Sequence, residues 1–349
     1  MAAPVDIFVD GAVAGPGTGT IGDPFKSIEY GIINSALDLT VGTAINVKTG
    51  TDQVLAAKLE TAFADTSVTA AWVPTDIAQI TIEGYESVAR DLRGTTKVAA
   101  IDGNSIGVLP DGTLDRINLF HMRLHNSGAN HLCSIDENCM VLFCEFDNCT
   151  GTNRYLLNVD SGLIMGNYFH NFEGYGARMD NGSIVGNHFF DDGATPVLAI
   201  QCVPGQMIAR NLIRFNEGGV AVGIQTASLD YGTIMNNGIF SNGGTGNGIL
   251  VTNGGVRDAI LNNVIQGFSG SGGVGINMDA TNTGVTTFAN NSIFDCTTAW
   301  IDPDAGPIYE TGNEILTESP WVDPLNGDFS PKNVGSMKEG SFPGYFLTR

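Results

Sequence analysis

The stretch Ile234-Met-Asn-Asn-Gly-Ile-Phe240 decides the fold, because its frame recurs along the chain. Two apolar residues are followed by a variable residue, a pivot that is usually Asn, another variable residue and an apolar residue. The frame occurs eight times between Leu119 and Ile293, with consecutive pivots 22, 23, 20, 24, 26, 26 and 28 residues apart. The pivots are Met122, Cys144, Asn167, Asn187, Asn211, Asn237, Asn263 and Asn291. A period of this size predicts a solenoid.

Two columns of this frame are apolar in every copy. Two residues after the pivot stand Leu124, Phe146, Phe169, Phe189, Ile213, Ile239, Ile265 and Ile293. Two residues before it stand Phe120, Leu142, Met165, Val185, Ala209, Met235, Leu261 and Ala289. The columns between them vary, which is the period of two that strands show. We therefore predict a pair of short strands in each copy, with both apolar columns in the core.

The pivot is expected at the bend between the two strands. Asn tolerates left-handed backbone geometry there and can hydrogen-bond its own main chain. Coils stacked about 4.8 Å apart would also bring the six pivot Asn side chains into one hydrogen-bonded ladder.

This pattern resembles the right-handed parallel β-helix of the pectate-lyase-like family, in which three short strands form each coil and an Asn ladder marks a tight turn. The resemblance implies an all-β, single-stranded solenoid with an N-terminal helical cap and a C-terminal capping tail. We expect residues 1–76 to form the N-terminal cap and first coil or coils with short helices. Residues 77–310 would form the β-helix coils and residues 311–349 the C-terminal cap or tail.

A cap is required because an open solenoid end would expose its core and an unpaired strand edge. At the N-terminus, an apolar face at helical spacing is formed by Ile28, Ile32, Ile33 and Ala36. A second helix is expected from Val54 to Phe63. The stretch from Trp321 to Phe329 resembles the closing motif that ends the stack in many such helices.

Composition and charge narrow the classes of partner. The chain has 349 residues, with 37 acidic and 16 basic residues, so its net charge of −21 would repel nucleic acid and anionic lipid. Neutral glycans, cations or other proteins fit better, although acidity also simply keeps a β surface soluble. No apolar run is long enough for a membrane span, and no leader is expected from Met1 to Gly11.

Cysteine spacing does not indicate a metal site. The six cysteines lack the paired spacing of metal ligands, so we expect no metal and no cofactor. Four of them lie within 17 residues, which permits a local disulfide, but buried thiols are the expectation. They are Cys133, Cys139, Cys144, Cys149, Cys202 and Cys296.

The outward columns carry the candidate site. One and three residues after the pivot point to the same side of a strand, about 6.6 Å apart. In the first copies these positions predict one polar patch, made of Arg123, His125, Glu145, Asp147, Tyr168, His170 and His188. The patch could bind a glycan by stacking a sugar on Tyr168, or perform acid–base chemistry through Asp147, His170 and His188. Alternatively, Arg123 with Glu145 and His125 with Asp147 are ordinary surface pairs.

Enzyme motifs of the resembled family are largely missing. Of the Asn-Thr-Asp, Asp-Asp, Gly-His-Gly and Arg-Ile-Lys elements of polygalacturonase-like members, only Asp191-Asp192 is present. The Arg-x-Pro-x-x-Arg element and the calcium carboxylates of pectate lyases are not evident. Aromatic residues on the outer face or at the tail predict a covered side, either by the chain's own tail or by a second subunit or a capsid; they are Phe190, Phe240, Phe294, Phe342, Tyr345 and Phe346.

These observations favour a non-catalytic structural protein of a bacteriophage particle, such as a capsid decoration, head fibre or tail-associated attachment protein. Its partners would be other virion proteins and itself, as a homotrimer, and a neutral or cell-surface glycan is a further option. The alternative is a secreted polysaccharide-active enzyme of the pectate-lyase-like fold: a lyase, a glycoside hydrolase or an epimerase.

Overall fold

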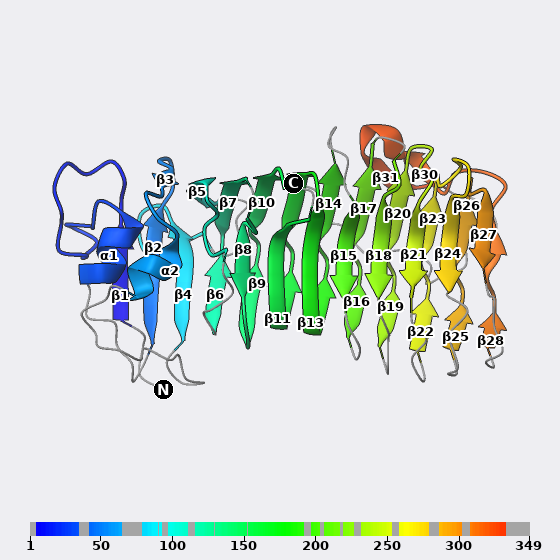
Figure 1. Cartoon of the computed structure of the whole chain (residues 1–349), viewed down its shortest axis with the longest axis horizontal. Helices are drawn as coiled ribbons and strands as arrows, with labels where there is room; N and C mark the ends of the chain where they lie inside the picture. The colour runs from blue at the N-terminus through cyan, green and yellow to red at the C-terminus, as the bar shows by residue number, and fades with distance from the viewer. Residues whose placement is uncertain are drawn as a thin grey trace. The chain divides into compact units, whose positions relative to one another are not determined.

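The computed structural model describes residues 5–332, except residues 35–41, 65–78, 90, 93–96, 111–115, 129, 152, 192–196, 203–205, 217–218, 227–231, 253–257, 279–285 and 302–307. The chain divides into two units, residues 1–168 and 169–348, and the boundary falls inside strand β12 (Tyr168–Phe172). Parallel strand pairing from coil to coil makes this a right-handed parallel β-helix, as predicted (Figure 1).

Unit 1 contains two short helices, α1 (Ile28–Asn34) and α2 (Leu59–Ala64). Ile28 and Ile32 of α1 are fully buried and Ile33 is half-buried, whereas Ala36 lies outside the described residues. The second helix starts later than predicted, because Val54 belongs to a short strand instead. Figure 1 shows both helices beside the first strands.

The strands of unit 1 form two parallel sheets. The first contains β1 (Val5–Val9), β2 (Thr43–Lys48), β4 (Ile80–Tyr85), β6 (Ile117–Phe120), β8 (Cys133–Ile135), β9 (Cys139–Leu142) and β11 (Tyr155–Met165). The second contains β3 (Gln53–Val54), β5 (Ala99–Ser105), β7 (Met122–Ser127) and β10 (Glu145–Cys149).

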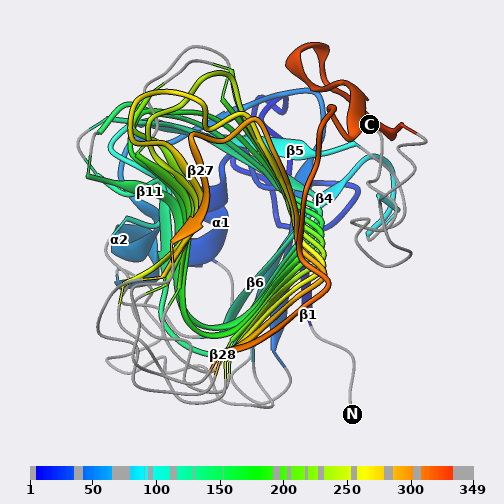
Figure 2. The same ribbon diagram turned by 90° about the vertical axis from the view of Figure 1, so that its right-hand side faces the viewer.

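Unit 2 repeats this arrangement over more coils. Its first sheet contains β13 (Tyr175–Val185), β15 (Leu198–Cys202), β16 (Met207–Ala209), β18 (Val222–Thr226), β19 (Thr233–Met235), β21 (Asn247–Val251), β22 (Asp258–Leu261), β24 (Val274–Met278), β25 (Thr286–Ala289), β27 (Thr298–Ile301) and β28 (Ile308–Thr311). Its second sheet contains β14 (His188–Asp191), β17 (Leu212–Phe215), β20 (Gly238–Ser241), β23 (Val264–Gln266), β26 (Ser292–Phe294) and β29 (Glu314–Ile315). In Figure 2 the yellow and orange coils of unit 2 superimpose in projection.

The register confirms one of the two predicted core columns and corrects the other. The column two residues after the pivot is buried in every copy and pairs in register, as in Ile213 with Ile239. The column two residues before it is mostly half-buried, as at Met235 and Leu261. The core is instead filled by the residue three before the pivot, such as Ile234 and Ile260, both at 0% exposure.

The bend explains this shift. The left-handed residue is not the pivot but the residue before it, as in Arg210 (φ 58°), Asn236 (φ 56°) and Asn290 (φ 54°). One left-handed residue bends the chain sharply, so the alternation of inward and outward side chains does not continue through it. The prediction that the pivot itself is left-handed was wrong.

The pivots of unit 2 form the predicted ladder. Each Asn amide donates from Nδ2 to the Oδ1 of the next pivot at 2.9–3.0 Å, and that Oδ1 also accepts from the donor's main-chain N–H. The row runs through Asn187, Asn211, Asn237, Asn263 and Asn291 to Asn313, which the sequence frame did not include. From Asn211 onward each Nδ2 also donates to a main-chain carbonyl of a preceding coil, so the amides bond other coils rather than their own main chain.

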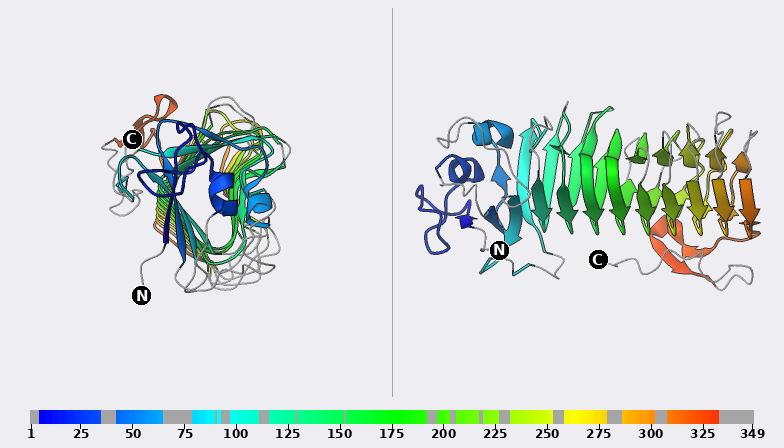
Figure 3. Two further views of the ribbon diagram at one scale, coloured as in Figure 1. Left: turned by 90° about the vertical axis from the view of Figure 1, so that its left-hand side faces the viewer. Right: turned by 90° about the horizontal axis from the view of Figure 1, so that it is seen from below.

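The C-terminal segment folds back over the outside of unit 2 instead of ending the stack. Strands β30 (Trp321–Asp323) and β31 (Asp328–Pro331) form an antiparallel pair joined by the 3-10 turn η1 (Pro324–Asn326). Figures 2 and 3 show this red segment outside the coils of the second sheet. Trp321 is fully buried there against Phe240 and Val264, with the Phe329 ring 5.2 Å from its own ring.

Two further findings bear on earlier predictions. All six cysteines are free thiols; five are buried, as predicted, and Cys296 is half-buried. Among the described residues, no helix is long and apolar enough to cross a membrane.

Candidate functional site

Charged side chains gather on the outer face of the second sheet in unit 1. Strands β7 and β10 pair in parallel, which places Arg123 opposite Glu145 and His125 opposite Asp147. Strand β5 adds Asp102 opposite His125. The alternation of a strand sends all of these side chains to the same side, away from the core residues Leu124 and Phe146. We call Arg123, His125, Glu145 and Asp147 the charged face.

Arg123 joins the two carboxylates of β10. Its Nη2 donates to Asp147 Oδ2 at 2.6 Å, diagonally across the strands, and its Nε lies 3.4 Å from Glu145 Oε1. The Asp147 side chain is only 5% exposed, against 18% for Glu145 and 37% for Arg123. A carboxylate this buried is costly unless a charge compensates it, so this is not an ordinary surface pair.

The pKa of Arg123 reflects these neighbours. Burial alone would lower the pKa of the guanidinium, but the hydrogen bond and charge of Asp147, together with Glu145 and Asp52, raise it above its usual value. Arg123 therefore stays charged under all ordinary conditions and holds the two carboxylates at a fixed point of the sheet.

The sequence pattern missed two further carboxylates, Asp102 of β5 and Asp52. Asp52 stands just before β3, and its Oδ2 lies 3.6 Å from Nε2 of His125. The His125 side chain is 9% exposed, whereas that of Asp52 is 53% exposed. Asp52 precedes the first copy of the repeat, so no column could identify it.

The other residues of the predicted patch divide between the units. Tyr168 in unit 1 is half-buried, and its main-chain N–H donates to the Cys144 carbonyl at 2.8 Å. His170 and His188 belong to unit 2 and are half-buried. His170 Nδ1 lies 3.0 Å from Nδ2 of Asn171, and His188 is paired with Leu212 in the strand register. A catalytic role for either histidine stays a prediction.

The outer face of the second sheet in unit 2 differs in chemistry. At the positions that carry charge in unit 1, it presents Leu212, Val264 and Phe240, all buried. Arg214 donates from Nη2 to the Leu325 carbonyl and holds its guanidinium 4.1 Å from the centre of the Phe190 ring. We call this the covered face, because the C-terminal segment lies on it.

The predicted contact aromatics have different surroundings. Phe240 is 5% exposed beneath the C-terminal segment, and Phe329 packs edge-on against it. Phe190 and Phe294 are half-buried. Phe342, Tyr345 and Phe346 lie outside the described residues.

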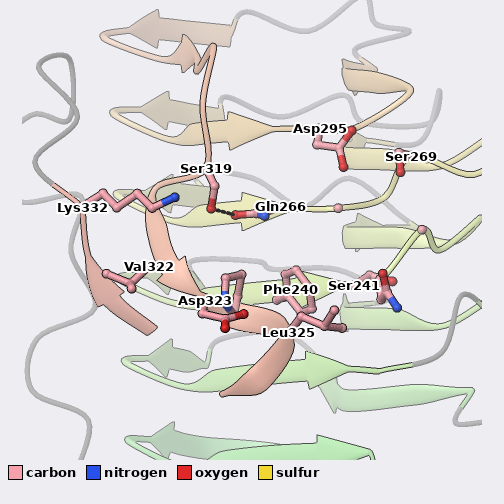
Figure 4. Close-up of a pocket in the computed structure, with 14 residues that line it drawn as sticks. Phe240, Ser241, Gln266, Ser269, Asp295, Ser319, Val322, Asp323, Leu325 and Lys332 are labelled. Atoms are coloured by element: carbon pink, nitrogen blue, oxygen red, sulfur yellow. Dashed lines mark hydrogen bonds between the residues drawn. The ribbon is translucent and has the colours of Figure 1, made fainter. Parts of the chain in front are cut away.

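A pocket of about 370 Å³ opens between the C-terminal segment and the covered face (Figure 4). Its wall combines the polar side chains of β20, β23 and the following loops with apolar side chains of β30 and η1. The segment that closes this pocket is far in sequence from the strands beneath it. The repeat therefore could not predict where the pocket lies.

Comparison with known proteins shows no family for this chain. No family model matches the sequence, and no curated protein matches it. Two solved structures of GH136 lacto-N-biosidase from Eubacterium ramulus, the native protein and its selenomethionine derivative, match with TM-scores of 0.44 and 0.41. Both are 13% identical, and each match covers 88% of this chain and 67% of the other. At this identity the likeness concerns the fold alone, and no residue role is transferred.

The prediction of a non-catalytic virion protein is corrected. The matched structures are those of a glycoside hydrolase and not of a virion protein, which runs against that prediction. In addition, Phe240, which was predicted to contact a subunit or capsid, is already covered by the chain itself.

Proposed function

We propose that this chain is a polysaccharide-active enzyme that hydrolyses a glycosidic bond of an uncharged glycan at the charged face. The observation that supports the proposal is the pair Glu145 and Asp147, held on one side of β10 by a single guanidinium.

The spacing of the pair suits the chemistry. Alternate residues of a strand lie on one side with their Cα atoms about 6.6 Å apart. Glycoside hydrolysis uses two carboxyl groups, roughly 5–5.5 Å apart in retaining enzymes and roughly 6.5–9.5 Å apart in inverting ones. Carboxylate oxygens of Glu145 and Asp147 lie within 4.8 Å of one another, which is nearer to the separation in retaining enzymes than to that in inverting ones.

The surroundings assign different roles to the two carboxylates. Asp147 is nearly buried and is oriented by its hydrogen bond with Arg123, so it serves as the nucleophile or as the base that activates water. Glu145 is the more exposed of the two and can exchange protons with solvent, so it serves as the acid that protonates the leaving oxygen.

Charge favours hydrolysis over elimination. A lyase needs a uronic acid substrate and a cation to neutralise its carboxylate, but Arg123 is already engaged by Asp147 and Glu145. The net charge of −21 would also repel a polyuronate. An uncharged glycan meets neither obstacle.

The test is an assay on neutral oligosaccharides and aryl glycosides with Asp147→Asn and Glu145→Gln. Each substitution should lower kcat/KM by about 10²–10⁴-fold, the usual contribution of a positioned acid or base. The Glu145→Gln loss should be much smaller on a dinitrophenyl glycoside, because that leaving group needs no proton. Asp180→Asn is the matched control, since Asp180 forms a half-exposed ion pair with Arg178 in the first sheet of unit 2.

Two outcomes would refute the proposal. One is cleavage of a neutral glycan that is unaffected by both substitutions. The other is cleavage of polyuronates with release of an unsaturated product. The same assay on His170→Gln and His188→Gln decides whether the predicted roles of those histidines are real.

A further inference from the structure

We propose that the pocket beneath the C-terminal segment is a second carbohydrate site, which binds one uncharged sugar ring without cleaving it. All of its lining residues belong to unit 2, and none takes part in the chemistry proposed for the charged face. The volume of about 370 Å³ lies at the small end of ligand pockets, roughly 300–1,000 Å³.

The pocket is held open by fixed structure. Trp321 anchors β30 against Phe240 and Val264, and Arg214 holds the Leu325 carbonyl from the opposite side. Asp323 accepts from the main-chain N–H and the Nδ2 of Asn326, which fixes the turn η1. A site whose walls are fixed in advance loses little conformational entropy when a ligand binds.

A buried amide in the pocket has unused donors. Gln266 is 8% exposed, and its Oε1 accepts from Ser319 Oγ at 2.9 Å. That contact orients the amide so that Nε2 points away from Ser319, across the pocket wall (Figure 4). Within the described part of the chain, this Nε2 has no hydrogen-bond partner. This Nε2 is not fully buried, so it can donate to solvent or to a ligand hydroxyl in the pocket.

The remaining polar groups surround the same space. Asp295 offers acceptor oxygens and Ser269 a hydroxyl on one side, and Lys332 extends its Nζ from the other side (Figure 4). In the described structure neither Asp295 nor Lys332 has an ion-pair partner. Donors and acceptors on opposing walls match a ring that carries several hydroxyl groups.

The apolar part of the wall completes the match. Val322 and Leu325 line the pocket and are 47% and 46% exposed, so their apolar surface is open to a ligand. The C–H face of a pyranose ring can cover such side chains while its hydroxyls bond to the polar wall.

The test uses the full chain with Asp147→Asn, so that hydrolysis at the charged face does not interfere. A panel of uncharged methyl glycosides is titrated while the methyl signals of Val322 and Leu325 are followed by NMR. At least one glycoside should shift both methyl signals and saturate. Gln266→Met and Asp295→Asn should each weaken that binding about tenfold, as loss of a hydrogen bond in a buried site does.

The controls separate this proposal from the enzymatic one. Asp328→Asn changes an exposed acid of β31 that does not line the pocket, so it should bind like the parent. Pocket variants should keep their activity on short aryl glycosides, whatever their effect on binding. The proposal is overturned if no glycoside saturates the Val322 and Leu325 shifts, if amino acids bind there instead, or if Asp295→Asn, at an exposed side chain, leaves binding unchanged.

Discussion

The charged face of unit 1 and the covered face of unit 2 have the same backbone plan and opposite surfaces. Both lie on the outside of a second sheet, at the positions one and three residues after the pivot. In unit 1 these positions hold Arg123 and Asp147 among others, and in unit 2 they hold Val264 and Phe240. The ladder and core columns therefore determine the structure of the coil in both units. The outward columns can carry either a polar site or a surface that another segment covers.

Substitution of Trp321, which anchors the C-terminal segment on the covered face, should have the largest effect on the free energy of unfolding. Trp321 is fully buried, so Trp321→Ala should lower the free energy of unfolding by roughly 3–5 kcal/mol and release the C-terminal segment. Thermal unfolding and hydrogen exchange of the β20 and β23 amides would show both effects.

Trp321→Phe is the control for this substitution. The indole Nε1 is buried without a hydrogen-bond partner in the described structure, so its loss should cost much less than the loss of the ring. A change below about 1 kcal/mol in Trp321→Ala would show that the segment is only loosely attached and that the two faces differ less than proposed.

Substitution of the cation on the charged face should have an intermediate effect. Arg123→Met leaves the 5% exposed Asp147 carboxylate without its partner, which should cost about 2–3 kcal/mol, less than the roughly 3–5 kcal/mol of a fully buried pair because Arg123 is 37% exposed.

The matched comparison is Arg178→Met. Arg178 and Asp180 are 37% and 36% exposed, so loss of that pair should cost less than about 1 kcal/mol. Equal costs for the two substitutions in chemical denaturation would mean that the charged face is no more than an ordinary polar surface.

The smallest expected effect concerns thiol reactivity. Burial raises the pKa of Cys296 to about 11, because it disfavours the thiolate, so alkylation should be slow at pH 8 and rise about tenfold per pH unit up to that pKa. Burial raises the pKa of Cys139 further, to about 12, and that thiol is 1% exposed. Mass spectrometry after brief alkylation should therefore find Cys296 labelled first, and first labelling of Cys139 would contradict the packing of unit 1.

The raised pKa values of these two thiols also decide how the free energy of unfolding changes with pH. A folded-state pKa above that of the unfolded chain keeps the proton on the native thiol, while the unfolded chain loses it from about pH 9 upward. The unfolded state then binds fewer protons, so these thiols lower the free energy of unfolding as pH rises above about 9.

The repeat predicted much of the fold because backbone pairing is periodic. It identified the parallel coils, the Asn ladder and the core column that contains Ile239. It misplaced the second core column, since the left-handed residue, such as Asn236, shifts the alternation by one position, and a sequence does not show which of two adjacent Asn residues takes that geometry.

The candidate sites were predictable only where they follow the period. Arg123 and Asp147 occupy neighbouring columns, so their proximity could be foreseen, although the diagonal bond depends on side-chain length and the sequence favoured a straight pairing. Asp52 precedes the first copy. Ser319 meets Gln266 across 53 residues of sequence, and only the folding back of the C-terminal segment brings them together.

The Asn ladder of unit 2 has a direction. Every amide from Asn187 to Asn291 donates toward the C-terminal end, and the main-chain N–H bonded to each Oδ1 fixes which amide atom is the oxygen. The side-chain dipoles therefore align head to tail, and bonds in such a chain polarise one another. The positive end is Asn313, whose Nδ2 lies 3.5 Å from the Glu310 carboxylate. The row thus acts as a small electric dipole along the solenoid, with an acidic side chain at its positive pole, as acidic residues stand at the start of an α-helix.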